Sequence, residues 1–392
     1  MKNYYLVNNG RLKREQNTLI VETAAGEKKP IPVEDVDSLY LYGEVDLNTK
    51  LLNFLSQKRV PLHVFNYYGF YSGSYYPREY LHSGYALVQQ VRHYTDETCR
   101  MTIAREIVRA SAHSLQRVVA YYERRGAGDS AQEDREPTGE IGIEQGDPVL
   151  DEGLEAAVDS ALDAPAEGSP AEDGSSDSLG ADVDLPEEAE SLEQLQARLK
   201  GLSAQIDRQA RVNDLRGLEG KMRERYYQAW RHILGADWAF TRRMRRPPGN
   251  EVNALISFGN SVLYTACLSE IYRTQLTPTI SYLHEPGARR FSLALDLSEI
   301  FKPLIVDRAI FRLLNSGQMK PSHFDKSMEG CLLTDSGRRL FLAALEERLG
   351  TTIRHRRLGR HVSYRHLLRL ECYKLIRHLT GVEPYRGFRA WW

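Results

Sequence analysis

The sequence predicts an α+β protein with two unequal parts, a small N-terminal β-sandwich-like domain and a larger all-α C-terminal domain. Strand-like stretches separated by turn residues fill the first 80 residues, and apolar residues recur at helical spacing from about residue 93 onward. The length of 392 residues allows two domains with separate hydrophobic cores. We therefore expect a β-rich domain over residues 1–80, a connector over 81–92 and a helical domain over 93–392.

Turn residues divide the N-terminal part into short strands. Asn8, Asn9 and Gly10 are typical of a turn after the first strand, whose expected partner is the second strand. The elements expected here are strands over 3–7, 17–22, 38–42 and 60–65 and a helix over 49–59. Eleven tyrosines occur up to Tyr85, and we expect sheet and interface packing from them rather than stacking on bases. His63 lies in an apolar run and is expected to be a core histidine.

Helical periodicity dominates the C-terminal part. Ile103, Ile107 and Leu115 are spaced for one face of a long amphipathic helix over 95–125. Further helical stretches are expected over 195–213, 218–233, 252–266, 340–349 and 364–379. Pro303 should begin a new helix or kink the preceding one.

A strongly acidic segment interrupts these helices. Between Gly126 and Glu193 there are 22 Asp and Glu against one basic residue, Arg135, whereas the rest of the chain has 51 Lys and Arg against 31 Asp and Glu. The net charge of −1 thus conceals a basic body suited to polyanions. Because the segment is too polar to offset its ordering entropy, we expect 126–190 to be a disordered insertion. It could mimic DNA or cover a basic face, or it could be a tolerated insertion that aids solubility.

Cysteine usage and hydropathy indicate a cytoplasmic protein. The four cysteines form no CxxC pair, so a zinc ribbon or a disulfide framework is not expected. The sequence has neither a signal-peptide-like segment nor a run of about 18 apolar residues, so we expect no membrane association.

Potential ligands of a divalent metal occur in the second half of the chain. Glu219, His284, Asp296 and Glu299 provide one imidazole and three carboxylates within a basic surround, a donor set suited to a hard cation that must also meet a phosphate. If Asp296 and Glu299 begin a helix, their i, i+3 spacing puts both on one side. Each residue also has an ordinary structural interpretation, as a helix-dipole partner, a turn residue or a member of a capping box.

Other common chemistries lack their sequence motifs. There is no HExxH helix, no GxxxxGK[ST] phosphate loop, no GxSxG nucleophile elbow and no glycine-rich dinucleotide fingerprint after a strand. The metal-dependent hypothesis is therefore the one that the residue types favour.

Three blocks around these residues resemble a known family. They are similar to blocks of the universal CRISPR-associated adaptation integrase, and the resemblance extends to Leu283-His284 and the tail from Arg354 to Trp392. The blocks are 215–220 (Leu-Arg-Gly-Leu-Glu-Gly), 246–259 (Arg-Pro-Pro-Gly-Asn-Glu-Val-Asn-Ala-Leu-Ile-Ser-Phe-Gly) and 292–308 (Ser-Leu-Ala-Leu-Asp-Leu-Ser-Glu-Ile-Phe-Lys-Pro-Leu-Ile-Val-Asp-Arg). The resemblance excludes the acidic segment and implies a β domain joined to a helical catalytic domain.

The resemblance also implies a reaction. Glu219 and His284 match the family's metal-binding glutamate and histidine, and Asp296 and Glu299 match its acidic pair, of which Glu299 is the usual third ligand. Because Glu299 stands where some members have Asp, the direct ligand of the pair stays open. The implied activity is Mg²⁺- or Mn²⁺-dependent insertion of a short DNA duplex into a CRISPR array, by attack of a 3′-hydroxyl on a phosphodiester.

Partners follow from the same resemblance and from the charge. Arginines near the proposed ligands are expected to contact the phosphates of double-stranded DNA, namely Arg242, Arg243, Arg245, Arg246, Arg289 and Arg290. The family implies a homodimer formed through the β domain, a small ferredoxin-like second adaptation subunit and, in some systems, a RecB-like nuclease. Two other functions stay open: a structure-specific repair nuclease that uses water as nucleophile, and a non-catalytic DNA-binding scaffold.

Overall fold

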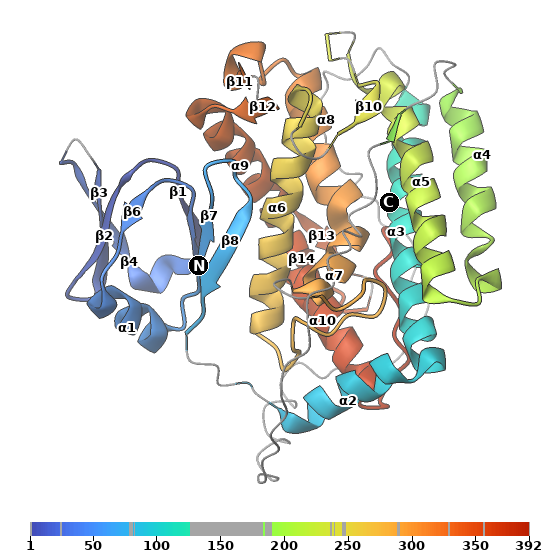
Figure 1. The fold of residues 1–392 in the computed structure, drawn as a ribbon, viewed down its shortest axis with the longest axis horizontal. Coiled ribbons are helices and arrows are strands. Elements are labelled where there is room, and N and C mark those ends of the chain that lie inside the picture. The colour runs from blue at the N-terminus through green and yellow to red at the C-terminus, as the bar shows by residue number, and fades with distance from the viewer. Residues whose placement is uncertain are drawn as a thin grey trace.

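The computed structural model describes residues 2–23, 26–77, 81, 83–125, 183–184, 190–235, 237–238, 240–244, 248–287, 291–327, 330–355 and 357–391. A strand-rich part comes first and lies at one end of the molecule, and a mainly helical part forms the rest (Figure 1). This arrangement confirms the predicted fold class. The predicted disorder of 126–190 concerns residues that lie, apart from 183–184 and 190, outside the described ranges.

Two four-stranded sheets and one helix form the N-terminal part. The first sheet contains β1 (Lys2–Leu6), β5 (Val36–Leu41), β7 (Leu62–Phe65) and β8 (Tyr71–Tyr75), in that order. The second contains β4 (Lys28–Pro32), β3 (Thr18–Thr23), β2 (Gly10–Glu15) and β6 (Val45–Asp46). Helix α1 (Thr49–Lys58) packs on both through a shared core that includes Leu12, Leu39, Leu51, Phe54 and Leu62.

The expected pairing of the first two strands is wrong. β1 pairs in parallel with β5, and β3 pairs antiparallel with β2, across a tight turn where Gln16 adopts a φ of 53°. β2 was not predicted because charged residues surround its single inward-facing apolar side chain, Leu12. The strands predicted near 38–42 and 60–65 and the helix near 49–59 are confirmed.

The C-terminal part consists mainly of helices. They are α2 (Gly84–Thr95), α3 (Glu97–Arg125), α4 (Leu192–Ser203), α5 (Val212–Ile233), α6 (Glu251–Tyr272), α7 (Ser292–Lys302), α8 (Arg308–Asn315), α9 (Asp335–Gly350) and α10 (Tyr364–Leu379). Three two-stranded ribbons pair β9 (Val183–Asp184) with β10 (Arg242–Arg243), β11 (Phe324–Ser327) with β12 (Gly330–Leu333), and β13 (Thr352–Arg354) with β14 (His361–Ser363). Short 3₁₀ turns occur at Val33–Asp35, Ile206–Arg208 and Pro321–His323. The stretch predicted as a connector over 81–92 is therefore helical from Gly84 onward, capped by Ser83, whose side chain accepts a hydrogen bond from the Ala86 amide.

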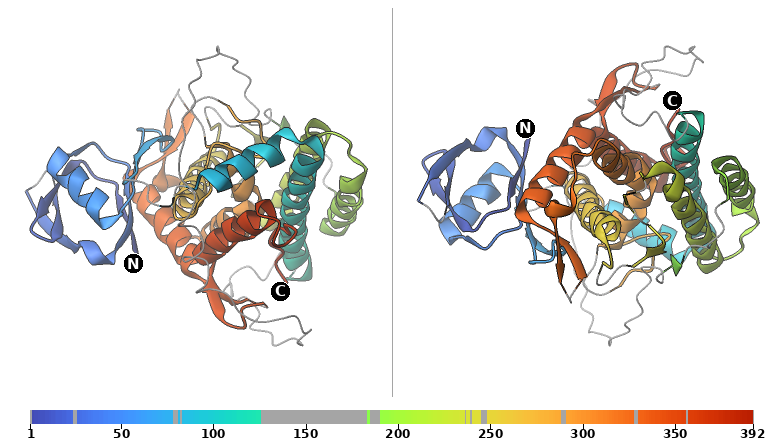
Figure 2. Two further views of the ribbon diagram at one scale, coloured as in Figure 1. Left: turned by 90° about the horizontal axis from the view of Figure 1, so that it is seen from below. Right: turned by 90° about the horizontal axis from the view of Figure 1, so that it is seen from above.

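Helix α6 runs through the middle of the helical part (Figure 2). Its composition and length resemble those of a membrane-spanning helix, and it is the only such helix among the described residues, but 83% of its apolar window is buried within the protein. Asn250 caps it by accepting a hydrogen bond from the Asn253 amide. Gly259 lies at a close helix crossing, because a Cβ there would lie 2.5 Å from Val306 and 3.0 Å from Phe341.

Proline changes the helical geometry after α7. Pro303 has no N–H to donate, and Pro303–Asp307 forms a π-helical turn before the chain continues as α8. This agrees with the prediction that Pro303 begins a new helix or kinks the old one. The turn places Asp307 in the interior, where it is 3% exposed.

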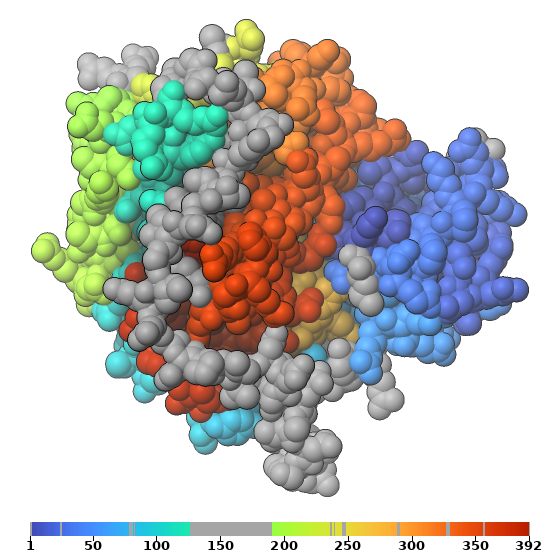
Figure 3. Space-filling view, turned by 180° about the vertical axis from the view of Figure 1, so that it is seen from behind, coloured from blue at the N-terminus to red at the C-terminus, as the bar shows by residue number. Residues whose placement is uncertain are grey.

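The two parts pack tightly against each other. Tyr42 stacks on Phe65 with 4.1 Å between ring centroids and lies 5.3 Å from the ring of Phe258 in α6. His63 is fully buried and its Nε2 lies 2.7 Å from the Ser269 hydroxyl of α6. The expectation of a core histidine and of tyrosines used in packing is thus confirmed at this interface. Seen from behind, the strand-rich part and helices α4 and α5 lie at opposite ends, with α9 and α10 between them (Figure 3).

Candidate active site

The predicted ligands lie on three segments of the helical part. Glu219 is in the second turn of α5, His284 is in the loop before α7, and Asp296 and Glu299 are within α7. Since α7 begins at Ser292, Asp296 and Glu299 do not form the capping box that was one interpretation of their spacing.

A cluster of charged side chains joins α5 to α7. Nη2 of Arg223 lies 3.4 Å from Oε1 of Glu219 and 2.5 Å from Oε2 of Glu299. The other oxygen of Glu299, Oε1, pairs with Nζ of Lys302. We refer to Glu219, Arg223, Glu299 and Lys302 as the charge cluster. Its side chains are between 10% and 20% exposed, so the cluster is largely buried but reachable from solvent.

The two cations of this cluster were not singled out from the sequence. A signal for them existed, because Arg223 follows Glu219 by four positions and Lys302 follows Glu299 by three, and such helical neighbours are in reach of each other. That Arg223 also spans to Glu299 depends on the packing of α5 beside α7, which no local spacing reveals.

Asp296 and His284 form a second, largely buried unit. Oδ1 of Asp296 accepts hydrogen bonds from the backbone N–H of His284 at 3.0 Å and from its ring Nδ1 at 2.7 Å. Oδ2 accepts the backbone N–H groups of Tyr282 and Leu283, at 2.7 and 3.0 Å. Asp296 is 0% exposed, and its two oxygens together accept these four hydrogen bonds. Its carboxylate therefore fixes the loop and the imidazole, and leaves Nε2 of His284 as the ring's coordinating atom.

Burial and neighbouring charges act in opposite directions on the two glutamates. Burial, followed by the negative charge of Glu299, raises the pKa of Glu219 above its ordinary value, despite opposition from Arg223. Burial also acts to raise the pKa of Glu299, but Lys302, Arg223 and His284 together lower it below the ordinary value. Glu299 is thus the more firmly ionised carboxylate of the cluster, and both glutamates and His284 influence one another electrostatically.

Asp307, at the end of the π-helical turn after α7, interacts electrostatically with Arg223, Lys302 and Glu299 of the charge cluster. Burial raises its pKa to about 7, against the lowering effect of Arg223. Its Oδ2 accepts no well-formed hydrogen bond among the described residues, and the hydroxyl of Tyr226 in α5 lies beside the same carboxyl and lowers its pKa by hydrogen bonding. A buried carboxyl without a satisfied oxygen is uncommon in a folded protein and calls for a functional explanation.

The chemistry of these donors fits a divalent cation, but their arrangement is not that of a formed metal site. In the described ranges, no group of three or more His, Cys, Asp and Glu side chains is placed to hold a metal ion. The oxygens of Glu219 and Glu299 are directed at Arg223 and Lys302 instead. The two glutamates therefore form a place suited to positive charge, and in this structure Arg223 and Lys302 provide that charge.

The arginines expected to contact DNA differ in their placement. Arg242 is exposed in β10. Arg243 is 4% exposed, and its guanidinium donates to Oδ1 of Asn253 at 2.9 Å and to Ser257 at 3.2 Å. A guanidinium held in this way supports the loop before α6, which does not fit the expected phosphate contact. Four more arginines of that expectation lie outside the described residues, namely Arg245, Arg246, Arg289 and Arg290.

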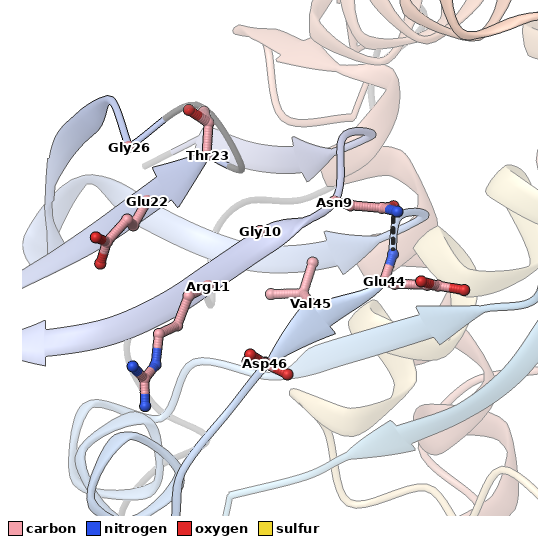
Figure 4. A pocket seen from close by; sticks show the side chains of 9 residues that line it. All are labelled: Asn9, Gly10, Arg11, Glu22, Thr23, Gly26, Glu44, Val45 and Asp46. Atoms are coloured by element: carbon pink, nitrogen blue, oxygen red, sulfur yellow. Dashed lines mark hydrogen bonds between the residues drawn. The ribbon is translucent and has the colours of Figure 1, made fainter.

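An open groove of about 750 Å³ occurs elsewhere, at the edge of the second sheet (Figure 4). It is lined by Asn9, Gly10, Arg11, Glu22, Thr23, Gly26, Glu44, Val45 and Asp46. These residues belong to the N-terminal part, and none of them is in the charge cluster. The groove is therefore no part of the candidate active site.

Comparison with known proteins decides the family. The family model described as CRISPR associated protein Cas1 matches residues 4–141 and 180–347. The chain belongs to the Cas1 family. The unmatched residues 142–179 fall within the acidic segment, which the resemblance also excluded, whereas the match to the family model ends at residue 347, before the tail over 354–392 that the resemblance included.

Individual relatives of this Cas1 family member agree along the whole chain. A CRISPR-associated endonuclease Cas1 from Moorella thermoacetica is 42% identical over 392 residues, which cover 100% of both chains. The structure of a Cas1 protein from Thermotoga maritima superposes with a TM-score of 0.74 at 36% identity, covering 98% of this chain and 99% of that one. A casposase bound to integration product has the same fold, with a TM-score of 0.74 at 17% identity over 100% and 95% of the two chains. The family and enzyme class expected from the sequence are confirmed: this is an endonuclease of the Cas1 family.

Proposed function

We propose that this Cas1 protein inserts short double-stranded DNA into a CRISPR array by metal-dependent transesterification at the charge cluster. The observation that carries the proposal is the meeting of Glu219, from α5, with Glu299, from α7, around positive charge. Oriented beside them by Asp296, His284 adds an imidazole nitrogen. Carboxylate and imidazole donors of this kind suit Mg²⁺ or Mn²⁺.

The proposed ligands are Glu219, His284 and Glu299, and we assign Asp296 to holding the imidazole. Because both oxygens of Asp296 already accept two hydrogen bonds each, it is a poor direct ligand. A bound divalent cation would supply charge stabilisation for the scissile phosphate and for the oxygens that gain charge. Of the acidic pair that the sequence left open, we thus propose Glu299, and not Asp296, as the direct metal ligand.

The chain's own residues would bind and orient the DNA around this place. We assign a phosphate contact to Arg242 because it is exposed and basic, and Lys302 lies next to Glu299, within reach of an anion at the cluster. The sequence alone supports the phosphate contacts that we propose for Arg245 and Arg246, which precede α6, and for Arg289 and Arg290, which precede α7. In the reaction a DNA 3′-hydroxyl attacks the phosphorus in line, and another 3′-oxygen leaves.

Several wider expectations belong to this proposal. We propose that 1–80 serves as the dimerisation domain and 93–392 as the catalytic domain of a homodimer. Double-stranded DNA, the small second adaptation subunit and, in some systems, a RecB-like nuclease would be its partners, in the prokaryotic cytoplasm. Two proteins of the same fold form Cas6-RT-Cas1–Cas2 complexes, which supports a second adaptation subunit as a partner of this protein.

Strand transfer by a matched pair of variants tests the proposal. Glu219→Gln should abolish integration of a labelled duplex into a supercoiled array plasmid, with the second subunit and Mn²⁺ present, while duplex binding persists. Glu224→Gln is the control, because Glu224 lies on the same helix, its side chain is 35% exposed, and it forms an ion pair with its neighbour Arg225. Full strand transfer by Glu219→Gln would contradict the assignment. Hydrolysis without joined product in the unmodified protein would favour the repair nuclease instead.

A further inference from the structure

Arg223 lies where two of the proposed metal ligands meet. It is the one residue of the charge cluster that contacts both glutamates, with Nη2 at 3.4 Å from Glu219 and 2.5 Å from Glu299. Lys302, by contrast, pairs with Glu299 alone among the described residues. Two carboxylates and two cations make the cluster neutral as it stands.

A neutral, buried cluster has little affinity for an additional divalent cation. The positive charge would add to that of Arg223 within a few ångströms, in surroundings where charges are poorly screened. A metal ion can be coordinated by oxygens of both Glu219 and Glu299 only if the guanidinium of Arg223 leaves its position between the two carboxylates. It therefore needs another acceptor within the reach of one side chain.

Asp307 is our candidate for this acceptor. It is 3% exposed, its Oδ2 is unsatisfied within the described structure, and its charge stabilises the charged guanidinium of Arg223. The hydroxyl of Tyr226, one helical turn after Arg223, faces the same carboxyl and interacts with it. A buried carboxyl that still has an unsatisfied oxygen is what a second position of that arginine requires.

We propose that Arg223 is an internal cation that occupies the position between Glu219 and Glu299 in the metal-free protein and turns to Asp307 when a divalent cation binds. The proposal rests on the metal site of the proposed function and adds a positioning residue to it. Arg223 would keep the two carboxylates apart and ionised before the metal arrives. It would also make metal binding weaker than the ligands alone would give, so that the site fills mainly when DNA supplies additional negative charge.

Mn²⁺ binding to the full-length, DNA-free protein tests this proposal without any activity measurement. The loss of the electron paramagnetic resonance signal of free Mn²⁺ measures the binding. Arg223→Gln should bind Mn²⁺ roughly tenfold or more tightly than the unmodified protein, because the competing charge is gone. Asp307→Asn should bind it several-fold more weakly, because Arg223 loses its second acceptor. Arg225→Gln, on the same helix and with a side chain 32% exposed, is the matched control and should change the affinity by less than about twofold.

A double-mutant cycle separates a moving arginine from a general charge effect. If Asp307 acts only through Arg223, then Asp307→Asn has no further effect on Mn²⁺ affinity in the Arg223→Gln background. Equal effects of Asp307→Asn in both backgrounds would overturn the proposal, as would a folded Arg223→Gln protein with unchanged or weaker binding. If circular dichroism shows that Arg223→Gln does not fold, Asp307→Asn alone decides, and unchanged affinity in that variant overturns the proposal.

Glu219→Gln distinguishes this failure from failure of the proposed function. Loss of Mn²⁺ binding in Glu219→Gln with no gain in Arg223→Gln would reject only the role of Arg223. Unchanged Mn²⁺ binding in Glu219→Gln would reject the metal site itself.

Discussion

Replacing Asp296 by asparagine should damage both the stability of the protein and its metal site. The carboxylate accepts four hydrogen bonds, three from successive backbone amides and one from the ring of His284. A carboxamide has a single acceptor oxygen, which can keep two of the four donors. Two bonds to a charged acceptor are then lost, at about 1.5–3 kcal/mol each, so Asp296→Asn should lower the free energy of unfolding by about 3–6 kcal/mol.

The same change should alter the imidazole. With the amide nitrogen facing Nδ1 of His284, that ring atom becomes the acceptor and the proton moves to Nε2. A protonated Nε2 cannot bind a metal, so Mn²⁺ affinity should fall roughly 10–100-fold, the size usual for loss of a residue that orients a ligand. With the amide oxygen facing the ring, the amides of Tyr282 and Leu283 lose their acceptor instead, and the loop is released.

Urea unfolding and Mn²⁺ titration measure the two effects on the same protein. Asp214→Asn is the control, because this residue of α5 has a side chain 39% exposed and should change stability by no more than about 0.5 kcal/mol. An Asp296→Asn protein that unfolds within about 1 kcal/mol of the parent and binds Mn²⁺ equally well would refute the reasoning. Loss of metal binding without loss of stability would make Asp296 a direct ligand rather than a support.

Three further predictions concern packing, pH and DNA. Gly259→Ala should destabilise the protein by about 1–3 kcal/mol through overpacking, measured by thermal unfolding, whereas Gly217→Ala, with open space around it in α5, should stabilise it by up to about 1 kcal/mol. The folded-state pKa of Asp307, about 7, lies above its ordinary value of 3.8, so the folded state loses relative stability as the pH rises from about 4 to 7. Asp307→Asn should therefore be more stable than the parent at pH 8 by at most about 4 kcal/mol in urea unfolding, with no gain near pH 4; an equal gain at both values would contradict this. Arg242→Gln should reduce the salt dependence of DNA binding by about one charge, while Arg243→Gln should mainly lower the unfolding temperature; the reverse result would place Arg243 at the DNA.

Much of this fold could be predicted because its signals are local. Strand composition, helical periodicity and the proline after Lys302 lie within short windows of sequence, and they give a β-rich part followed by a helical one. The partner of β1 could not be predicted, because a parallel pairing with β5 depends on a crossover through the second sheet. Helix α2 was not predicted because several of its apolar residues face solvent and so do not follow the spacing of a buried helix face. Tyr85 and Val88, for example, are 61% and 48% exposed.

The sequence by itself determined the family, the residue types of the site and the basic body hidden behind a near-neutral total charge. It also supplied Glu219, His284 and Glu299 as candidates, because their motifs are continuous stretches of chain. Only the tertiary structure shows which of these residues touch. Asp296 holds the ring of His284, Arg243 is buried against Asn253, and Arg223 joins Glu219 to Glu299, and each contact depends on which segments of the chain pack together.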